Sequence, residues 1–140
     1  MDEIAVELLN GQPLIACAKR HGISSGRAKT ALIRFCLKTN PDLYRQIIGR
    51  REPYYLRLSL IRANKEGFLS RVALLKKVTR HSSIWCLDTI AVVTLGGFYN
   101  RGIDKIDQFM GMPEKDMFRY PCVGKDGVRK IWSAIHAFGL

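Results

Sequence analysis

The sequence predicts an all-α protein made of two helical regions. Apolar residues recur at helical spacing along the chain, and glycine or proline residues separate these segments at short intervals. Hydrophobic residues make up 47% of the 140 residues, which is enough for one good core or two small ones. We place the boundary at the polar stretch His81-Ser82-Ser83, so the predicted domains are residues 1–82 and 83–140.

Three helices are expected in the first third of the chain. A helix from Glu3 to Leu9 is stopped by Asn10-Gly11, a pair typical of left-handed helix ends. Pro13 opens a second helix, which ends at His21-Gly22. Ser24 is the expected N-cap of a third helix that runs to about Lys38. The buried face of this third helix is expected to consist of Ala28, Ala31, Leu32 and Phe35.

The second and third helices resemble the broad superfamily of DNA-binding helix-turn-helix proteins, through the pattern Ala18-x-x-x-Gly22-Ile23-Ser24. Ala18 is small where two helices cross, Gly22 permits the positive φ of a turn, and Ile23 fills the corner. The third helix then begins with short polar or basic side chains, which can enter a major groove without a steric obstacle. A plain structural helix pair is the alternative.

A DNA-binding surface is predicted around the start of the third helix and the basic pair at residues 50–51. Ser25, Lys29 and Thr30 are expected to face base edges. The arginines are expected to hold phosphates. The complete predicted set is Ser24, Ser25, Arg27, Lys29, Thr30, Arg34, Arg50 and Arg51.

Residues 41–82 are predicted to form short amphipathic helices with basic residues on the outer face. Pro41 and Pro53 each open one helix, and Gly67 separates another. The apolar positions of that last helix are Leu69, Val72, Leu75 and Val78. We expect these faces to be buried in the same domain or against a dimer partner. Binding to a membrane surface is not expected, because the segments are short and broken.

The positive charge is concentrated before the predicted second domain. The net charge is +11, and residues 41–82 carry ten Lys or Arg against three acidic residues, while residues 83–140 carry seven against six. A strongly basic chain most often binds nucleic acid, because neutralised phosphates release counterions. A solvated face that only keeps the protein soluble is the alternative.

The end of the chain carries a pattern of glycines and apolar residues. Gly102-Ile103-x-x-Ile106 opens one helix, Pro121-x-Val123-Gly124-Lys125 makes a turn, and the closing helix ends in Gly139-Leu140. This stretch, extended to about residues 84–140, resembles the C-terminal domain of the bacterial RNA polymerase α subunit. The resemblance implies a compact helical fold related to helix-hairpin-helix modules. A glycine before a helix also lets backbone N–H groups approach an anion, so Gly124 and Lys125 are predicted to form a phosphate-binding turn.

This chain departs from that family at its DNA-contacting positions. The minor-groove arginine of the family falls on Val93, and its neighbouring asparagine falls on Gly96. The turn positions that are usually basic and then serine are Asp126 and Gly127. The resemblance therefore implies a retained fold with an altered DNA-reading surface, which suits a scaffold reused for protein contact.

No enzyme, cofactor or metal site is expected. The sequence has no nucleotide-binding loop, no Gly-x-Ser-x-Gly and no His-Glu-x-x-His. The four cysteines are scattered, so neither a zinc ribbon nor a dense disulfide framework fits. Cys17 and His21 are four residues apart and could share a helix face, a metal geometry only if two more ligands arrive from elsewhere. Simple packing is the favoured interpretation of that pair.

These observations predict a non-enzymatic, DNA-binding transcription regulator of bacterial, plasmid or phage type. Its partners would be double-stranded DNA and, through the C-terminal domain, RNA polymerase or another regulator. The alternative is a protein-interaction adaptor that mimics the α-subunit domain and binds polymerase or its σ factor without reading DNA. No signal peptide or membrane-spanning run is recognised, so a soluble, cytoplasmic protein is expected. A homodimer is compatible with the helix-turn-helix prediction, because a short recognition surface commonly needs two copies.

Overall fold

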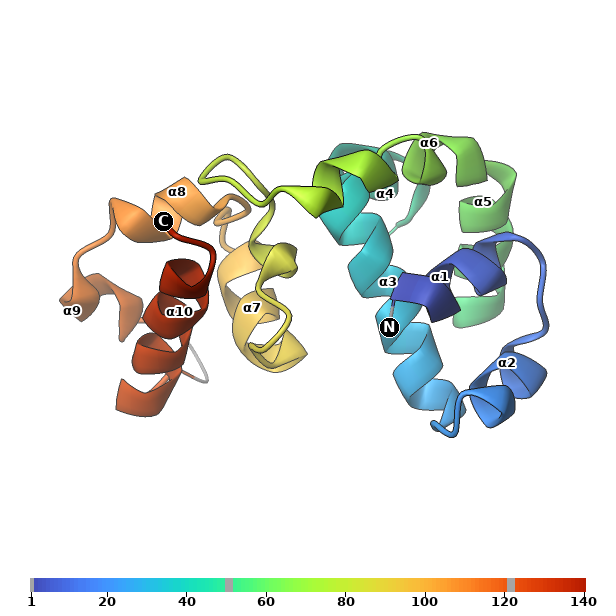
Figure 1. Cartoon of the computed structure of the whole chain (residues 1–140), viewed down its shortest axis with the longest axis horizontal. Coiled ribbons are helices and arrows are strands. Elements are labelled where there is room, and N and C mark those ends of the chain that lie inside the picture. The colour runs from blue at the N-terminus through green and yellow to red at the C-terminus, as the bar shows by residue number, and fades with distance from the viewer. Residues whose placement is uncertain (1, 50–51, 121–122) are drawn as a thin grey trace. The chain divides into compact units, whose positions relative to one another are not determined.

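The protein is built from helices. The computed structural model describes residues 2–49, 52–120 and 123–140, and within these ranges the only β-type pairing is an isolated bridge between Ser83 and Lys105. This confirms the predicted all-α class. The chain divides into two compact units, Met1–Lys76 and Lys77–Leu140 (Figure 1).

The first unit consists of short helices separated by capped turns. Its elements are α1 (Asp2–Leu9), α2 (Leu14–Arg20), α3 (Ser25–Thr39), α4 (Pro41–Ile47), α5 (Tyr54–Ala63), α6 (Lys65–Leu69) and the 3-10 helix η1 (Val72–Lys76). Gly11, with φ +99°, follows the end of α1 in the left-handed conformation, as the Asn10-Gly11 stop predicted. Ser24 caps α3, which confirms the predicted start of the third helix.

Helix α3 is the centre of the core of the first unit. Its buried side carries Ala28, Ala31, Leu32 and Phe35, as the apolar spacing predicted. Helices α1 and α2 pack against this side (Figure 1). Ala28, Leu32 and Phe35 belong to one cluster of buried residues. Its other members come from α1, α2, α5 and α6 and from the end of α3, and they are Ile4, Ala5, Leu8, Leu9, Cys17, Ala18, Cys36, Ile61 and Phe68. Because a buried Phe→Ala change typically costs 3–5 kcal/mol, Phe35 is a principal contributor to this core.

The prediction that Gly67 separates two helices is wrong. Gly67 lies inside α6, the chain leaves the α-helical form at Ser70, and Val78 lies in no helix. A β-carbon at Gly67 would lie 2.3 Å from Cδ2 of Leu43, so the glycine permits α4 to approach closely. The side-chain amide of Asn40 also donates to the carbonyl oxygen of Gly67 over 3.0 Å, which fixes this approach.

Helix α5 buries less of its apolar surface than its sequence indicates. Ile61 is fully buried, whereas Tyr55 is 71% exposed and Leu56 is 43% exposed. The helix is held at its C-terminal end by Arg62, which donates from Nε to the carbonyl oxygen of Leu8 over 2.8 Å. Its attachment therefore combines the buried Ile61 and the partly buried Tyr54 and Leu58 with a charged hydrogen bond.

The second unit packs small helices around aromatic residues. Its elements are the 3-10 helix η2 (Ile84–Cys86), α7 (Val92–Tyr99), α8 (Ile106–Met110), α9 (Glu114–Met117) and α10 (Lys125–Ala137). The ring of Phe98 lies edge-on to that of Phe109, with 4.8 Å between centroids, and 4.4 Å from that of Tyr120. Ile131 and Ile135 of α10 are fully buried and form the inner face of this closing helix.

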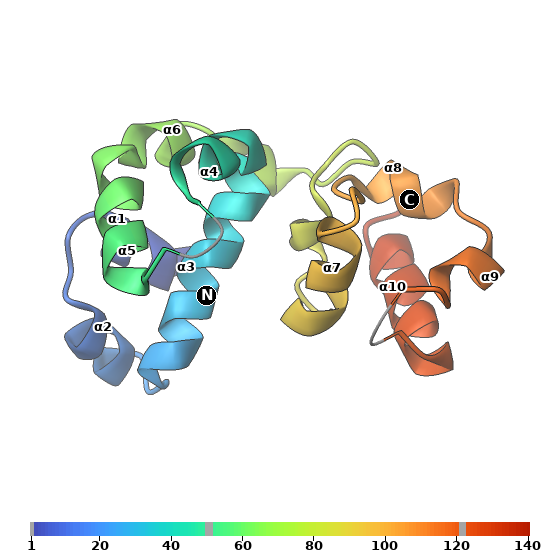
Figure 2. The same cartoon turned by 180° about the vertical axis from the view of Figure 1, so that it is seen from behind.

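The polar stretch at residues 81–83 belongs to the second unit, and the division between the units lies earlier, between Lys76 and Lys77. The carbonyl oxygen of Ser82 accepts a hydrogen bond from the N–H of Ile106 over 3.0 Å. The N–H of Ile84 donates to the carbonyl oxygen of Asp104 over 3.0 Å. Figure 2 shows this segment, seen from behind, beside the start of α8. Its polar side chains also serve the turn, because the hydroxyl oxygens of Ser82 and Ser83 accept hydrogen bonds from the N–H groups of Thr79 and Trp85.

Candidate nucleic-acid interface

The corner between α2 and α3 is closed by backbone hydrogen bonds. Gly22 adopts a φ of +68°, and the N–H of Ile23 then donates to the carbonyl oxygen of Ala18 over 3.0 Å. This is the bond that ends a helix at a left-handed glycine. The side chain of Ile23 is partly buried and packs against the core, which is the position expected for a residue that fills the corner between two helices. The local conformation predicted for residues 18–24 is therefore present.

The first turns of α3 present small and basic side chains to solvent. Ser24 caps the helix, because its hydroxyl oxygen accepts a hydrogen bond from the N–H of Arg27 over 3.2 Å. Ser24, Ser25, Gly26, Arg27 and Thr30 are all exposed. The side chain of Arg27 makes no ion pair or hydrogen bond with any residue that the structure describes. Four of the eight predicted DNA-binding residues thus form one accessible surface.

Lys29 lies differently from its predicted neighbours. It is half-buried, and its ammonium group lies over the ring of Tyr54, 4.8 Å from the centroid. Tyr54 is the first residue of α5, and burial raises the pKa of its hydroxyl. Lys29 therefore joins α3 to α5, a contact between positions 25 residues apart that local sequence does not predict.

The other arginines predicted to bind phosphate are not seen as exposed side chains. Arg34 is half-buried and already has an interaction within the protein. Arg50 and Arg51 lie outside the described residues. The structure therefore brings Arg34 onto the same helix as Arg27 and gives no position for the basic pair.

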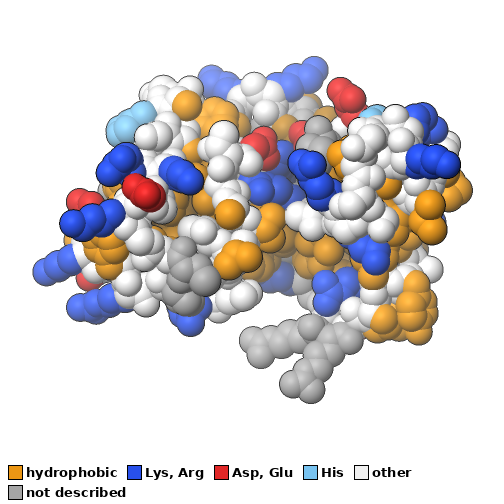
Figure 3. Space-filling view, turned by 90° about the horizontal axis from the view of Figure 1, so that it is seen from below, with side chains coloured by type: hydrophobic (Ala, Val, Ile, Leu, Met, Phe, Trp, Pro, Cys, Tyr) orange, Lys and Arg blue, Asp and Glu red, His pale blue; other side chains and the backbone are white. Residues whose placement is uncertain are grey.

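Some basic side chains of the first unit make hydrogen bonds within the protein and so contribute less to its exposed positive charge. Arg62 donates to the carbonyl oxygens of Leu8 and Gln12, and Arg57 donates to that of Glu52. Even so, residues 1–76 carry fourteen Lys or Arg against six acidic residues. In Figure 3, seen from the side where α2 and the start of α3 lie in Figure 1, Lys and Arg side chains are scattered among broad apolar areas over the first unit, and Asp and Glu side chains are sparse there. This charge balance favours an anionic partner.

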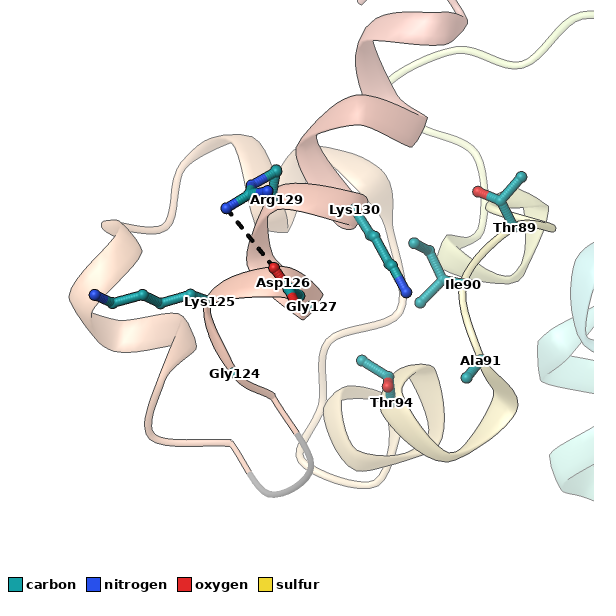
Figure 4. A pocket seen from close by; sticks show the side chains of 10 residues that line it. All are labelled: Thr89, Ile90, Ala91, Thr94, Gly124, Lys125, Asp126, Gly127, Arg129 and Lys130. Carbon is teal, nitrogen blue, oxygen red and sulfur yellow. Dashed lines mark ion pairs between the residues drawn. The ribbon is translucent and has the colours of Figure 1, made fainter.

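The predicted phosphate-binding turn borders a pocket of about 650 Å³ in the second unit. Gly124 is the extended residue before α10, without a side-chain cap, and the start of α7 lines the other side. Figure 4 shows Lys130 pointing toward Ile90 and Thr94, whereas Lys125 points to the opposite side of α10. Asp126 pairs with Arg129 over 3.7 Å, so one local positive charge is offset. Lys125, Arg129 and Lys130 all line this pocket, and Lys130, which was not among the predicted site residues, points toward its far wall.

Helix α7 presents an apolar rather than a basic side chain where the resemblance places a DNA-contacting arginine. Val93 is 67% exposed, and its neighbour Val92 is 39% exposed. Gly96, at the asparagine position, lies in the same helix, and a β-carbon there would meet nothing within 4 Å. This end of α7 can contact another apolar surface but offers no charge to a phosphate.

Comparisons with known proteins add no assignment. No protein-family model, curated protein or solved structure matches the chain. Among the residues that the structure describes, no helix has both the length and the apolar character needed to cross a bilayer.

Proposed function

We propose that this protein is a DNA-binding transcription regulator, with α2 and α3 acting as a helix-turn-helix. The observation that carries the proposal is the exposed start of α3, where short polar side chains and the exposed Arg27 follow the Gly22 corner. An α-helix start of this kind fits the major groove, where base edges carry a distinct pattern for each base pair. The basic balance of the first unit supports the same partner.

The exposed residues divide by chemistry into two roles. Ser25 and Thr30 carry hydroxyl groups that can donate to and accept from base edges, so they are proposed to read sequence. Arg27 and Arg34 are proposed to hold phosphates, together with Arg50 and Arg51. Lys29 reaches DNA by leaving the ring of Tyr54, and since such a contact is worth about 0.5–1 kcal/mol near a surface, this cost is small.

The second unit is proposed to contact the transcription machinery. Its resemblance to the polymerase α C-terminal domain supports this role, and so does the exposed apolar pair Val92 and Val93. The Gly124-Lys125 turn remains a proposed auxiliary phosphate contact at the uncapped start of α10. A cytoplasmic location follows from this function.

The exposed Val93 also favours a second candidate function, that of an adaptor which binds RNA polymerase or its σ factor without reading DNA. Under this candidate the basic first unit is only a solvated surface. Duplex binding by the full chain separates the two, because the regulator binds DNA with a steep salt dependence and the adaptor does not.

The test of base reading uses Thr30→Val, which keeps the side-chain shape and removes the hydroxyl. We expect the variant to select a different set of duplexes from a random pool, with an unchanged salt dependence. Arg27→Ala should instead weaken all duplexes alike. Equal loss on every sequence from both variants would contradict the assignment of Thr30 to base edges.

A further inference from the structure

We propose that Glu7, Cys17 and His21 form a Zn²⁺ site that joins α1 to the C-terminal end of α2. The carboxylate, thiol and imidazole of these residues bring their ligand atoms within 4.8 Å of one another. Oxygen, sulfur and nitrogen ligands together are the donors that zinc accepts, whereas calcium and magnesium prefer oxygen alone. The site is independent of the DNA-binding proposal.

The fold assembles this group from two helices. Cys17 and His21 lie one turn apart at the end of α2, so their side chains point to the same side. Helix α1 packs against α2 and supplies Glu7 from ten residues earlier than Cys17. The sequence spacing indicated only the Cys17–His21 pair, and the third ligand becomes visible once α1 is in place.

The ligand atoms lie within 4.8 Å of one another, so a tetrahedral metal can bind them after side-chain adjustments of roughly 1 Å. Zinc bonds of 2.0–2.3 Å place neighbouring ligand atoms roughly 3.3–3.7 Å apart. Sγ of Cys17 lies 3.3 Å from Oε2 of Glu7, which fits this range. Nε2 of His21 lies 2.5 Å from the same oxygen, a hydrogen bond that would open by roughly 1 Å when the metal replaces the shared proton.

The charges of the group also suit a divalent cation. The carboxylate of Glu7 and the thiolate of Cys17 together neutralise Zn²⁺, and the thiol releases its proton on binding. Arg20 donates to Oε1 of Glu7 over 3.0 Å, which holds the carboxylate so that Oε2 faces Cys17 and His21. Burial raises the pKa of the Cys17 thiol, and Arg20, which also interacts with this thiol, opposes that effect. Arg20 thus lies beside two of the three ligands and can orient them without itself bonding to the metal.

The exposure of the three ligand side chains indicates how an ion reaches the site. Cys17 is almost fully buried, whereas the side chains of Glu7 and His21 are 34% and 27% exposed, so the ion enters from the solvent side. Three protein ligands leave a fourth position for water. Because His21 immediately precedes Gly22, a bound ion would also fix the corner from which α3 starts.

The experiment is a Co²⁺ titration of the full chain, reduced with a phosphine, and followed by displacement with Zn²⁺. We expect one Co²⁺ per chain with a thiolate-to-cobalt charge-transfer band and the visible bands of a tetrahedral ion. Cys17→Ser should remove the charge-transfer band and weaken affinity by at least about 100-fold. Cys36→Ala, which changes another buried cysteine of the same unit, is the matched control and should keep the band.

A thermal measurement gives a second readout. Free Zn²⁺ at 100 times the dissociation constant should raise the unfolding midpoint of the first unit by roughly 10–20 °C, and Cys17→Ser should abolish this rise. If circular dichroism shows that Cys17→Ser does not fold, His21→Gln at the more exposed ligand takes its place. Absence of a charge-transfer band from the folded wild-type chain, persistence of the band in Cys17→Ser, or an unchanged Co²⁺ affinity in His21→Gln overturns the proposal.

Discussion

The N–H of Ile23 donates a hydrogen bond to the carbonyl oxygen of Ala18 over 3.0 Å, and this bond closes the corner between α2 and α3. It requires the intervening Gly22 to adopt a φ of +68°, which side-chain-bearing residues rarely do. The corner sets the direction in which α3 leaves α2. The position of the exposed start of α3 therefore depends on the conformation of this turn.

Gly22→Ala should destabilise the first unit by about 1 kcal/mol. A β-carbon there meets nothing within 4 Å, so backbone strain is the only expected cost. Gly26→Ala is the matched control, because Gly26 is helical and its β-carbon would lie 3.9 Å from Oγ of Ser24. The control should gain about 0.5–1 kcal/mol from better helix propensity. Urea unfolding measures both, and equal effects of the two changes would contradict this account of Gly22.

Ser24→Ala should destabilise the first unit by about 1 kcal/mol, because the N–H of Arg27 loses its capping oxygen. Ser25→Ala, one residue later and exposed, should change the unfolding free energy by less than about 0.5 kcal/mol. Chemical denaturation of the two variants checks the difference. A Ser25→Ala change as costly as Ser24→Ala would show that the cap does not reside in Ser24.

Arg62→Gln should destabilise the first unit by about 1–3 kcal/mol without weakening DNA binding. Its guanidinium donates to the carbonyl oxygens of Leu8 and Gln12 over 2.8 and 2.7 Å, so it joins α5 to the α1–α2 connection. Arg71→Gln removes an exposed arginine from the same unit and serves as the control for charge. We expect the control to change stability by less than about 0.5 kcal/mol. Equal stability of the two variants would rule out the structural role of Arg62.

Glu7→Gln should lower the free energy of unfolding at neutral pH, and this loss should become smaller as the pH falls. The hydrogen bond from His21, assisted by that from Cys17, lowers the pKa of the Glu7 carboxyl below its ordinary value of 4.5. Because the folded-state pKa is lowered, the ionised carboxylate contributes stability above about pH 4.5, and this contribution disappears as the pH falls through the folded-state pKa.

The pH dependence is measured by urea unfolding in a metal chelator, from neutral to acidic pH. Glu3→Gln, exposed in the first turn of the same helix, reports the contribution of the helix dipole alone. A gap between the wild type and Glu7→Gln that stays constant through the acidic range, or that matches the Glu3→Gln gap throughout, would contradict the lowered pKa.

Local sequence predicted the features that depend on neighbours along the chain. The left-handed Gly11 and Gly22, the Ser24 cap and the buried face of α3 follow from turn chemistry and helical spacing. Gly67 shows the limit, because the sequence cannot distinguish a helix breaker from a glycine that permits close packing. That distinction depends on Leu43, which arrives from a different helix.

The candidate site divides in the same way. The exposure of Arg27 and Thr30 follows from the opposite, buried positions on α3, so it could be predicted. The contact of Lys29 with Tyr54 and the approach of Glu7 to Cys17 and His21 could not, since both join residues that only tertiary packing brings together. Counting basic residues also overestimates the positive charge that can face DNA, because the guanidinium of Arg62 is hydrogen-bonded to the backbone of Leu8.

The most direct test of the DNA-binding account is fluorescence anisotropy of the full chain with a labelled random-sequence duplex across a salt series. We expect tight binding at low salt with a steep negative slope, and Arg27→Ala should reduce the slope by about 1. Arg119→Ala, which removes an exposed arginine from the second unit, should leave the slope unchanged. No salt-dependent binding by the wild type, or an equal reduction by Arg119→Ala, would contradict the assignment of DNA binding to α3.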